Sequence, residues 1–209
     1  MKEKYNLKIK VRFVAEKKLN VGSAYPVKSK AELPFQRLGA HYYIAGSTIK
    51  GVLRTSLIKI ANLLGYKGVS WSVEPTALSS AHNDIVVRLF GGPHDKESKV
   101  FVEPSYILHD TQVVRGIRID DKTGIVEEGA LFSIEYLPIG VEFETRIHGF
   151  DLDEEEARAL FAAILEMNFE RIGKSGVVSV KIVKGESEIP EELIEKDNVI
   201  KTILEAISI

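Results

Sequence analysis

The sequence YIAGSTIKGVLRTSL at residues 43–57 combines a glycine, two hydroxyl side chains and a helical repeat of apolar residues. Ser47 or Thr48 can serve as a helix N-cap, because a side-chain oxygen there accepts a hydrogen bond from a free N–H group of the first turn. Gly65 is a suitable stop, since glycine readily adopts the left-handed conformation that ends many helices. The apolar residues that recur at helical spacing are Ile49, Leu53, Leu57, Ile60 and Leu64. The stretch therefore predicts a helix that starts at residue 47 or 48 and stops near Gly65.

A strand is predicted upstream, at residues 5–14 (YNLKIKVRFV). Apolar and polar side chains alternate there with a period of two, which is typical of a strand with one buried face. The apolar set is Leu7, Ile9, Val11 and Phe13. Residues 15–46 then form a long connection without helical periodicity. Long ordered loops in compact domains are often functional, so this first loop is a candidate site.

A second loop-rich region, residues 66–99, follows the helix. Strands are predicted at residues 100–106, 112–119, 130–136, 141–148 and 176–183. A helix capped by Asp151 or Asp153 is predicted before the last of these strands, because three glutamates and an apolar face follow. Pro190 starts a C-terminal helix over residues 190–208.

The order strand, helix, strands, helix, strand predicts an α+β fold with a ferredoxin-like (RRM-like) βαββαβ core. The first connection is a long loop, a β-hairpin is inserted at residues 112–128, and a helix follows the core. A chain of 209 residues fits one domain, residues 1–209. This topology serves RNA-binding modules and many unrelated functions, so it leaves the function open.

Composition excludes several classes of protein. The chain contains no cysteine, which excludes a disulfide framework and thiolate-ligated metal sites and suits a reducing cytoplasm. No apolar run reaches the roughly 18 residues of a membrane span, and the charged N-terminus is unlike a signal peptide. The sequence therefore predicts a cytoplasmic protein without a membrane partner, starting at or near Met1.

Positive charge is concentrated in the first part of the chain. Residues 1–60 hold 13 Lys and Arg against three Glu, a formal balance of +10, whereas the whole chain carries −2. Such segregation points to a surface that faces a polyanion. The alternative is that these lysines are simply solvated.

The start of the first helix is suited to bind a phosphate. Gly46 lets another backbone approach, and Ser47 and Thr48 offer hydroxyl groups. Lys50 and Arg54 lie one turn apart on one face. Free N–H groups, hydroxyls and two cations together favour an anion such as an RNA phosphate. The alternative is a capped helix with a solvated basic edge, and the glycine spacing excludes a P-loop.

These residues resemble the signature of the CRISPR-associated RAMP superfamily, in particular the backbone subunit of type III effector complexes. That motif runs Ile-Pro-Gly-Ser-Ser-Leu-Lys-Gly-x-Leu-Arg, and here Ala45 replaces the proline and Thr48 the second serine. Further segments resemble the family in the same order, namely RLFGG at 88–92, DDKTGIVEEGALF at 120–132, YLPIGVEFETRI at 136–147 and RIGKSGVVSVKI at 171–182. The resemblance spans almost the whole chain.

The resemblance implies a protein that binds guide RNA and complementary target RNA, beside identical or paralogous RAMP subunits in a multi-subunit complex. The hairpin at residues 112–128 would be the thumb that enters the guide–target duplex. A glycine-containing loop would add N–H donors and a cation for a phosphate. The residues implied to contact RNA are Asn20, Ser47, Thr48, Lys50, Arg54, Arg115, Arg118, Gly173, Lys174, Ser175 and Gly176.

Two departures from the family pattern bear on catalysis. Members that cleave target RNA carry an Asp two residues before a Pro in the first long loop; here Pro34 fits that proline and Glu32 occupies the Asp position. Glu32 is the candidate catalytic residue, although its extra methylene can cost about 100-fold in rate. The upstream family histidine is Asn20, which can bind a phosphate but cannot act as a general base near neutral pH.

Three functions remain open from the sequence. The first is a guide-RNA-binding backbone subunit with at most weak cleavage of target RNA, which requires no cofactor. The second is an active endoribonuclease that uses a divalent ion such as Mg²⁺. The third is a ferredoxin-like interaction module without RNA. The five histidines show no paired spacing typical of a metal site, so no resident metal is predicted.

Overall fold

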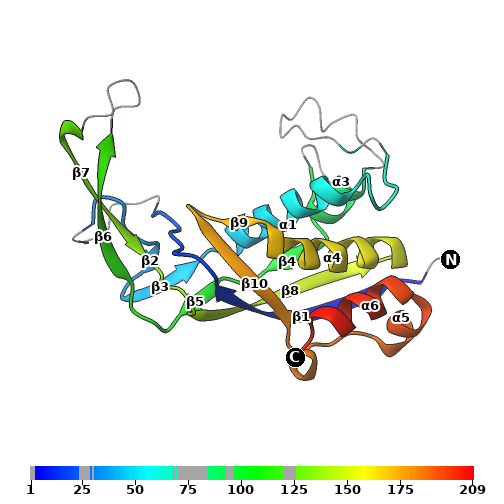
Figure 1. Cartoon of the computed structure of the whole chain (residues 1–209). Helices are drawn as coiled ribbons and strands as arrows, with labels where there is room; N and C mark the ends of the chain where they lie inside the picture. Colours follow the sequence, from blue (N-terminus) through cyan, green and yellow to red (C-terminus); the bar gives the residue numbers. More distant parts are fainter. Residues whose placement is uncertain are drawn as a thin grey trace.

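A five-stranded antiparallel sheet forms the centre of the computed structural model, with the strand order β4-β8-β1-β10-β9 (Figure 1). In chain order its strands are β1 (Tyr5–Ala15), β4 (Val100–Val102), β8 (Glu142–Leu152), β9 (Arg171–Ile172) and β10 (Gly176–Ile182). The structure describes residues 3–23, 29, 31–67, 69, 84–92, 97–119 and 126–209, and at residues 118, 119 and 126–130 it describes the backbone alone.

The strand β1 confirms the prediction made from alternating side chains. Its odd-numbered residues from Tyr5 to Ala15 are buried, whereas its even-numbered residues are exposed or half-buried. Phe13 has no exposed surface and its ring lies 5.1 Å from the ring of Phe143 on the neighbouring strand β8. Because successive side chains of a strand point to opposite faces, the sequence pattern identifies the face that meets the core.

Two helices cover the buried face of the sheet, α1 (Gly46–Ile60) and α4 (Glu154–Glu166), and they pack against each other (Figure 1). The short helix α3 (Ile85–Phe90) contacts both. Along the chain the elements run β1, α1, β4, β8, α4 and β10, and in space the strands follow the order β10-β1-β8-β4. This mixed α+β arrangement is consistent with the predicted ferredoxin-like core.

The first helix begins earlier than predicted. Neither Ser47 nor Thr48 is its N-cap; Ala45 holds that position, without a side-chain hydrogen bond, and the helix starts at Gly46. A Cβ added to Gly46 would overlap the carbonyl oxygen of Val102 in β4. The helix start is therefore set by close packing against the sheet rather than by a capping side chain.

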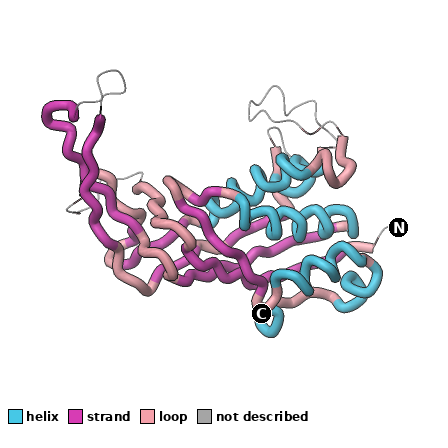
Figure 2. The backbone as a smooth tube through the Cα atoms, in the orientation of Figure 1, coloured by secondary structure: helices cyan, strands magenta, loops and turns pink. Residues whose placement is uncertain are grey.

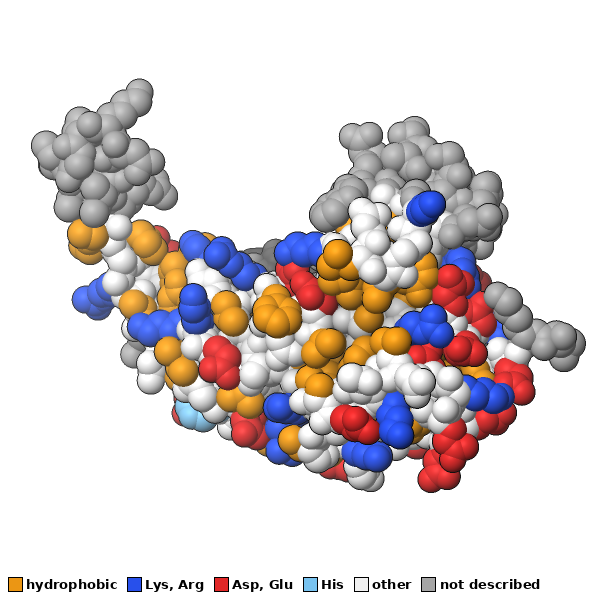
Figure 3. Space-filling model, turned by 45° about the vertical axis from the view of Figure 1, so that its right-hand side comes forward, with side chains coloured by type: hydrophobic (Ala, Val, Ile, Leu, Met, Phe, Trp, Pro, Cys, Tyr) orange, Lys and Arg blue, Asp and Glu red, His pale blue; other side chains and the backbone are white. Residues whose placement is uncertain are grey.

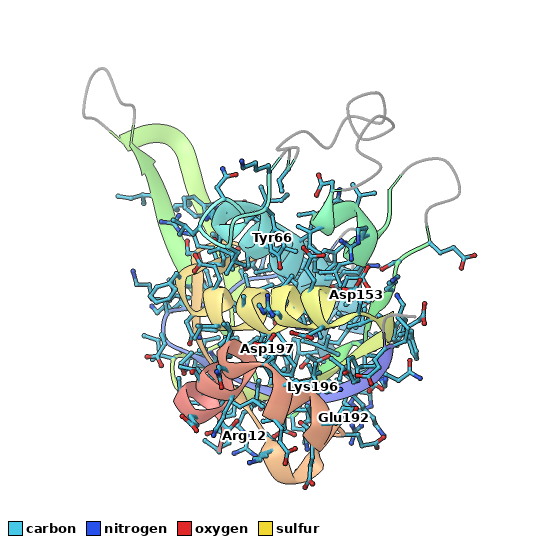
Figure 4. The ribbon with its side chains drawn as sticks, turned by 90° about the vertical axis from the view of Figure 1, so that its right-hand side faces the viewer. Arg12, Tyr66, Asp153, Glu192, Lys196 and Asp197 are labelled. Carbon is cyan, nitrogen blue, oxygen red and sulfur yellow. The ribbon has the colours of Figure 1, made fainter. Side chains whose placement is uncertain are left out.

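The C-terminal region contains two helices instead of the single predicted one. They are α5 (Glu191–Lys196) and α6 (Asn198–Ile207), and they follow the 3₁₀ turn η2 (Lys184–Glu186). Asp197 interrupts the helical path because its carboxylate accepts hydrogen bonds from the N–H groups of Val199 and Ile200. Arg158 of α4 also donates to Asp197, at 2.6 Å, and Figure 4 shows Asp197 between α4 and the C-terminal helices.

A second, three-stranded sheet lies beside the central one and has the order β2-β3-β5. It consists of β2 (Arg37–Leu38), β3 (His41–Ile44) and β5 (Ser105–Ile107). The single strand predicted at residues 100–106 is thus divided between two sheets. Pro104 stands between β4 and β5, and a proline cannot donate the hydrogen bond that a continuous strand requires.

A two-stranded ribbon extends from one end of the molecule (Figure 2). Its strands are β6 (Gln112–Ile119) and β7 (Val126–Tyr136), and they pair from Gln112 opposite Tyr136 towards the tip. The hairpin predicted at residues 112–128 is therefore present, but its second strand continues to residue 136. Residues 120–125, between the two strands, lie outside the described residues.

Candidate nucleic-acid interface

The surface between the β6–β7 ribbon and the helices α1 and α3 is hollowed, and Lys and Arg side chains lie along this concave edge (Figure 3). Opposite it, around α5 and α6, acidic and basic side chains are interspersed. A curved surface that carries positive charge is the general form of a single-stranded nucleic-acid site.

Lys50 and Arg54 lie side by side on α1 without an acidic partner among the described residues. The Lys50 amine donates to the hydroxyl of Ser98 at 2.6 Å, and an Arg54 guanidinium N–H donates to the carbonyl of Gly91 at 3.3 Å. The Arg54 Nε is buried without a hydrogen-bond partner in the described part of the chain. Ser47 is exposed and Thr48 half-buried one turn before Lys50. The helix therefore presents two cations whose charge no described carboxylate neutralises.

This arrangement disfavours the charged form of the Lys50 amine. Burial lowers the pKa of its amine below the ordinary value, and the positive charge of Arg54 lowers the pKa further. Both causes act against the protonated amine. An anion placed between the two side chains would offset them, so the pair is suited to a phosphate.

The loop Gly173-Lys174-Ser175-Gly176 joins β9 to β10 and packs on the segment around Asn20. The backbone N–H of Lys174 donates to the carbonyl of Asn20 at 2.7 Å, and the N–H of Asn20 donates back at 3.3 Å. Gly173 adopts a φ of 61°, and a Cβ there would overlap the Asn20 carbonyl oxygen. The side chains of Lys174 and Ser175 are exposed. One predicted N–H donor is therefore used inside the protein, while the Lys174 amine faces solvent.

Asn20 itself is buried, with 4% of its surface exposed. Its amide donates to the backbone carbonyl of Glu135 at 2.6 Å. The side chain predicted to touch RNA thus links two parts of the protein. Contact between Asn20 and RNA stays a prediction.

Glu32 and Arg115 both lie next to Ser133 of the ribbon. The backbone N–H of Glu32 donates to the hydroxyl of Ser133 in β7 at 3.0 Å, and Arg115 of β6 is paired with Ser133 in the ribbon register. Both charged side chains are exposed. The structure therefore brings the candidate carboxylate and one predicted RNA contact to neighbouring positions. The side chain of Arg118 lies outside the described residues.

The chain matches a known protein family over most of its length. The family model of the RAMP superfamily matches residues 16–177, most of the chain. The chain belongs to the RAMP superfamily. Its membership implies an RNA-binding role in CRISPR systems, with CRISPR RNA and Cas complexes as partners in general. No curated protein matches the chain significantly.

The matched region of this RAMP protein includes a buried carboxylate that its sequence did not reveal. Glu135 in β7 is 3% exposed and accepts hydrogen bonds from the side chains of Tyr42 at 3.0 Å and Thr111 at 2.5 Å, and from Arg37. Burial acts to raise the pKa of Glu135, but the hydrogen bonds from its donors outweigh burial and lower it. The sequence carries no signal for this cluster, because Glu135 and Arg37 stand 98 positions apart.

Folding pairs part of the charge concentrated at the start of this RAMP protein with carboxylates. On the sheet face away from α1 and α4, Lys10 pairs with Glu144 at 2.8 Å and Glu186 at 2.6 Å. Arg12 pairs with Glu144 at 2.8 Å. Lys10 and Arg12 of β1 are therefore paired with carboxylates, and a polyanion-facing surface formed by the +10 segment stays a prediction.

The described part of this RAMP protein holds no group of three or more His, Asp or Glu that could bind a metal ion. In the same part of the chain, no helix is long and apolar enough to cross a membrane.

Proposed function

We propose that this RAMP protein is a guide-RNA-binding backbone subunit of a type III CRISPR interference ribonucleoprotein. In this proposal a ferredoxin-like core holds the guide and the ribbon contacts the guide–target duplex, beside identical or paralogous subunits. The observation that carries the proposal is the pair Lys50 and Arg54, two adjacent cations with no acidic partner among the described residues.

The chemistry of this pair suits a phosphodiester. Lys50 is a point charge with three donors, whereas the guanidinium of Arg54 is a planar fork that can hold two phosphate oxygens. The hydroxyl of Ser47 stands one turn before Lys50 on an exposed part of the same helix. Donors of this kind fix the path of an RNA strand without reading its sequence, which suits a subunit that must accept any guide.

The double variant Lys50→Ala/Arg54→Ala should bind single-stranded guide RNA roughly 10- to 100-fold more weakly at about 0.15 M salt, because two charge-assisted phosphate contacts are lost. The slope of log affinity against log salt should become shallower by about 1.4, since each contact to a single strand contributes about 0.7. Fluorescence anisotropy across a salt series measures both quantities.

A matched control is Lys4→Ala/Lys8→Ala, which removes the same charge elsewhere on the surface. Lys8 pairs with Glu188 at 2.8 Å, and Lys4 approaches Asp151 at 3.9 Å. This control should keep wild-type affinity and salt slope. Equal losses of RNA affinity in both double variants would mean that net charge alone explains the effect and that α1 is not part of the RNA site.

The affinity should also depend on pH through Lys50. Because burial and Arg54 lower the pKa of the amine from its ordinary value of 10.5, Lys50 loses its proton at a lower pH than an ordinary lysine, and RNA affinity should fall in that window. The free energy of unfolding should instead rise there, since the unfolded chain binds this proton more tightly.

Anisotropy with a 2′-O-methyl oligonucleotide, which resists alkaline hydrolysis, tests this between about pH 7 and pH 10. The variant Lys50→Arg keeps its charge in this range and should show a flatter profile. Identical profiles for the two proteins would mean that Lys50 does not contact the bound strand.

Target-RNA cleavage is a second candidate function, supported by the position of Glu32 beside Arg115 at the ribbon base. A Mg²⁺ ion commonly combines one or two carboxylates with substrate phosphates. Wild-type complex should then cleave complementary RNA slowly, Glu32→Asp should cleave faster, and Glu32→Gln should be inactive. Cleavage that persists unchanged in Glu32→Gln would exclude Glu32 from the reaction.

A further inference from the structure

Glu135 is a buried carboxylate at the point where the β6–β7 ribbon leaves the body. One of its oxygens accepts hydrogen bonds from Arg37, Tyr42 and Thr111. The other accepts from the backbone N–H of Phe35 at 2.9 Å. Phe35 lies just before β2, Arg37 begins β2, Tyr42 lies in β3 and Thr111 directly precedes β6. A single side chain therefore joins three separate segments to the second strand of the ribbon.

Stability alone does not require a carboxylate here. Removing a charged group from water is costly, and a buried ion pair can often be replaced by apolar residues without loss of stability. Around Glu135 the cost is offset by four strong donors, and the resulting pKa is lower than that of an ordinary glutamate despite burial. What such a network supplies beyond stability is one defined geometry, because each donor has a fixed direction.

Both strands of the ribbon depend on this geometry. Thr111 directly precedes β6 and Glu135 lies in β7, so the same carboxylate ties the two strands together at their base. The loop segment at Leu33 runs beside β7 and exchanges backbone hydrogen bonds with Ser133 and Glu135, each of 3.0 Å. That segment also carries Glu32, so the cluster sets the position of the candidate carboxylate relative to the ribbon.

We propose that Glu135 is a positioning residue that fixes the direction of the β6–β7 ribbon relative to the helix α1. It thereby sets the distance between Arg115 on the ribbon and the Lys50–Arg54 site. The effect on RNA rests on the proposed function; the effect on the ribbon does not.

The variant Glu135→Gln keeps the shape of the side chain but removes its charge. A glutamine amide has one acceptor oxygen and presents N–H donors where Glu135 has its second oxygen. It cannot satisfy the N–H of Phe35 together with Arg37, Tyr42 and Thr111. The segments around Glu135 should separate, and the ribbon should sample several directions.

Distance measurements by double electron–electron resonance test this directly, because the chain has no native cysteine. Spin labels at Leu131→Cys on the ribbon and Leu63→Cys on the body occupy positions that are 69% and 86% exposed. The distance distribution should be about twofold broader or more in the Glu135→Gln protein than in the labelled parent. Unchanged widths would overturn the inference.

The control Glu144→Gln removes a carboxylate that pairs with Lys10 and Arg12 on the sheet, and it should leave the distribution unchanged. If Glu135→Gln fails to fold, Thr111→Val decides the question. It deletes one donor from the start of the ribbon while retaining a β-branched side chain. A broadened distribution supports the inference, and a wild-type distribution overturns it.

RNA binding separates this inference from the proposed function. Glu135→Gln should bind single-stranded guide with less than about threefold change, because the Lys50–Arg54 site is intact, but it should bind the guide–target duplex about 10-fold more weakly. A broadened ribbon in a protein that binds no RNA at all would contradict the proposed function and leave the positioning role standing. Normal RNA binding with an unchanged distance distribution would support the proposed function and contradict the positioning role of Glu135.

Discussion

Replacing Gly46 with alanine should lower the free energy of unfolding by about 3 kcal/mol or more. The new Cβ would overlap the carbonyl oxygen of Val102 and lie 2.8 Å from its carbonyl carbon. Both atoms belong to the backbone of β4, which cannot move aside as a flexible side chain could. The helix α1 would have to shift away from the sheet, and its apolar face, which includes Leu53 and Leu57, would lose contacts throughout the core.

Urea denaturation followed by circular dichroism measures this loss, with Gly51→Ala as the matched control on the same helix. A Cβ at Gly51 would meet no atom of the described residues within 4 Å. Since alanine is favoured over glycine in a helix by up to about 1 kcal/mol, the control should be stabilised. A Gly46→Ala protein within about 0.5 kcal/mol of wild type would show that the helix start does not depend on this contact.

Gly51 also offers a test of the RNA site. It lies between Lys50 and Arg54 on the exposed side of α1, where a glycine costs stability and no described part of the chain requires one. A strand held by the two cations would run close to this point. Gly51→Ala should therefore raise stability while it weakens guide binding, and this opposite pair of effects is specific to a residue under a ligand.

Replacing Glu156 with alanine should cost about 3–5 kcal/mol of folding free energy, because it breaks a buried ionic network. The Glu156 carboxylate is 2% exposed. It accepts hydrogen bonds from Arg88 of α3 at 3.0 Å, from Lys99 at 2.8 Å, and from the backbone N–H of Asp153 at 2.9 Å. Asp153 caps the same helix, and Figure 4 shows it at the start of α4. Removal of Glu156 would leave one cation, Lys99, without a carboxylate and would break half of the capping box.

The matched control is Glu154→Ala, in the same helical turn. In the described part of the chain Glu154 pairs only with Arg158, four residues later on the surface, so its loss should cost about 0.3–0.5 kcal/mol. Thermal and urea unfolding of the two variants give the comparison. Similar small losses for both would contradict a structural role for the network. The network also gives Arg88, in the segment RLFGG, a defined role in packing, since Arg88 donates to Glu155 and Asp153 as well.

The sequence predicted those features whose cause is local. Alternation in β1 identified its buried face, and Asp153, one of the two predicted caps, begins α4. Such signals lie within a few residues of one another, so a pattern along the chain contains them. The resemblance to the RAMP superfamily agrees with the family match, but the contacts of each predicted RNA-binding residue with RNA stay predictions.

The helix boundaries show where local signals mislead. Ser47 and Thr48 have good capping side chains, yet the helix starts at Gly46 because the sheet lies against it. The apolar residues of the C-terminal region recur at helical spacing on both sides of Asp197. Asp197 nevertheless ends α5 and caps α6. At Gly46 a contact with another element outweighs the preference of the segment itself, whereas at Asp197 a local cap divides the helix.

Sequence alone determined the order of the long core elements β1, α1, β8, α4 and β10, because each depends on side-chain periodicity over a few turns or residues. It did not reveal the short elements β2, β3 and α3. Tertiary structure decided which charges remain available for a ligand. Arg12 and Glu144 stand 132 positions apart, and only folding pairs them, whereas no described carboxylate pairs with Lys50 or Arg54. The interaction energy of two charges depends on the distance between them in space. The positions of the residues along the chain do not give that distance.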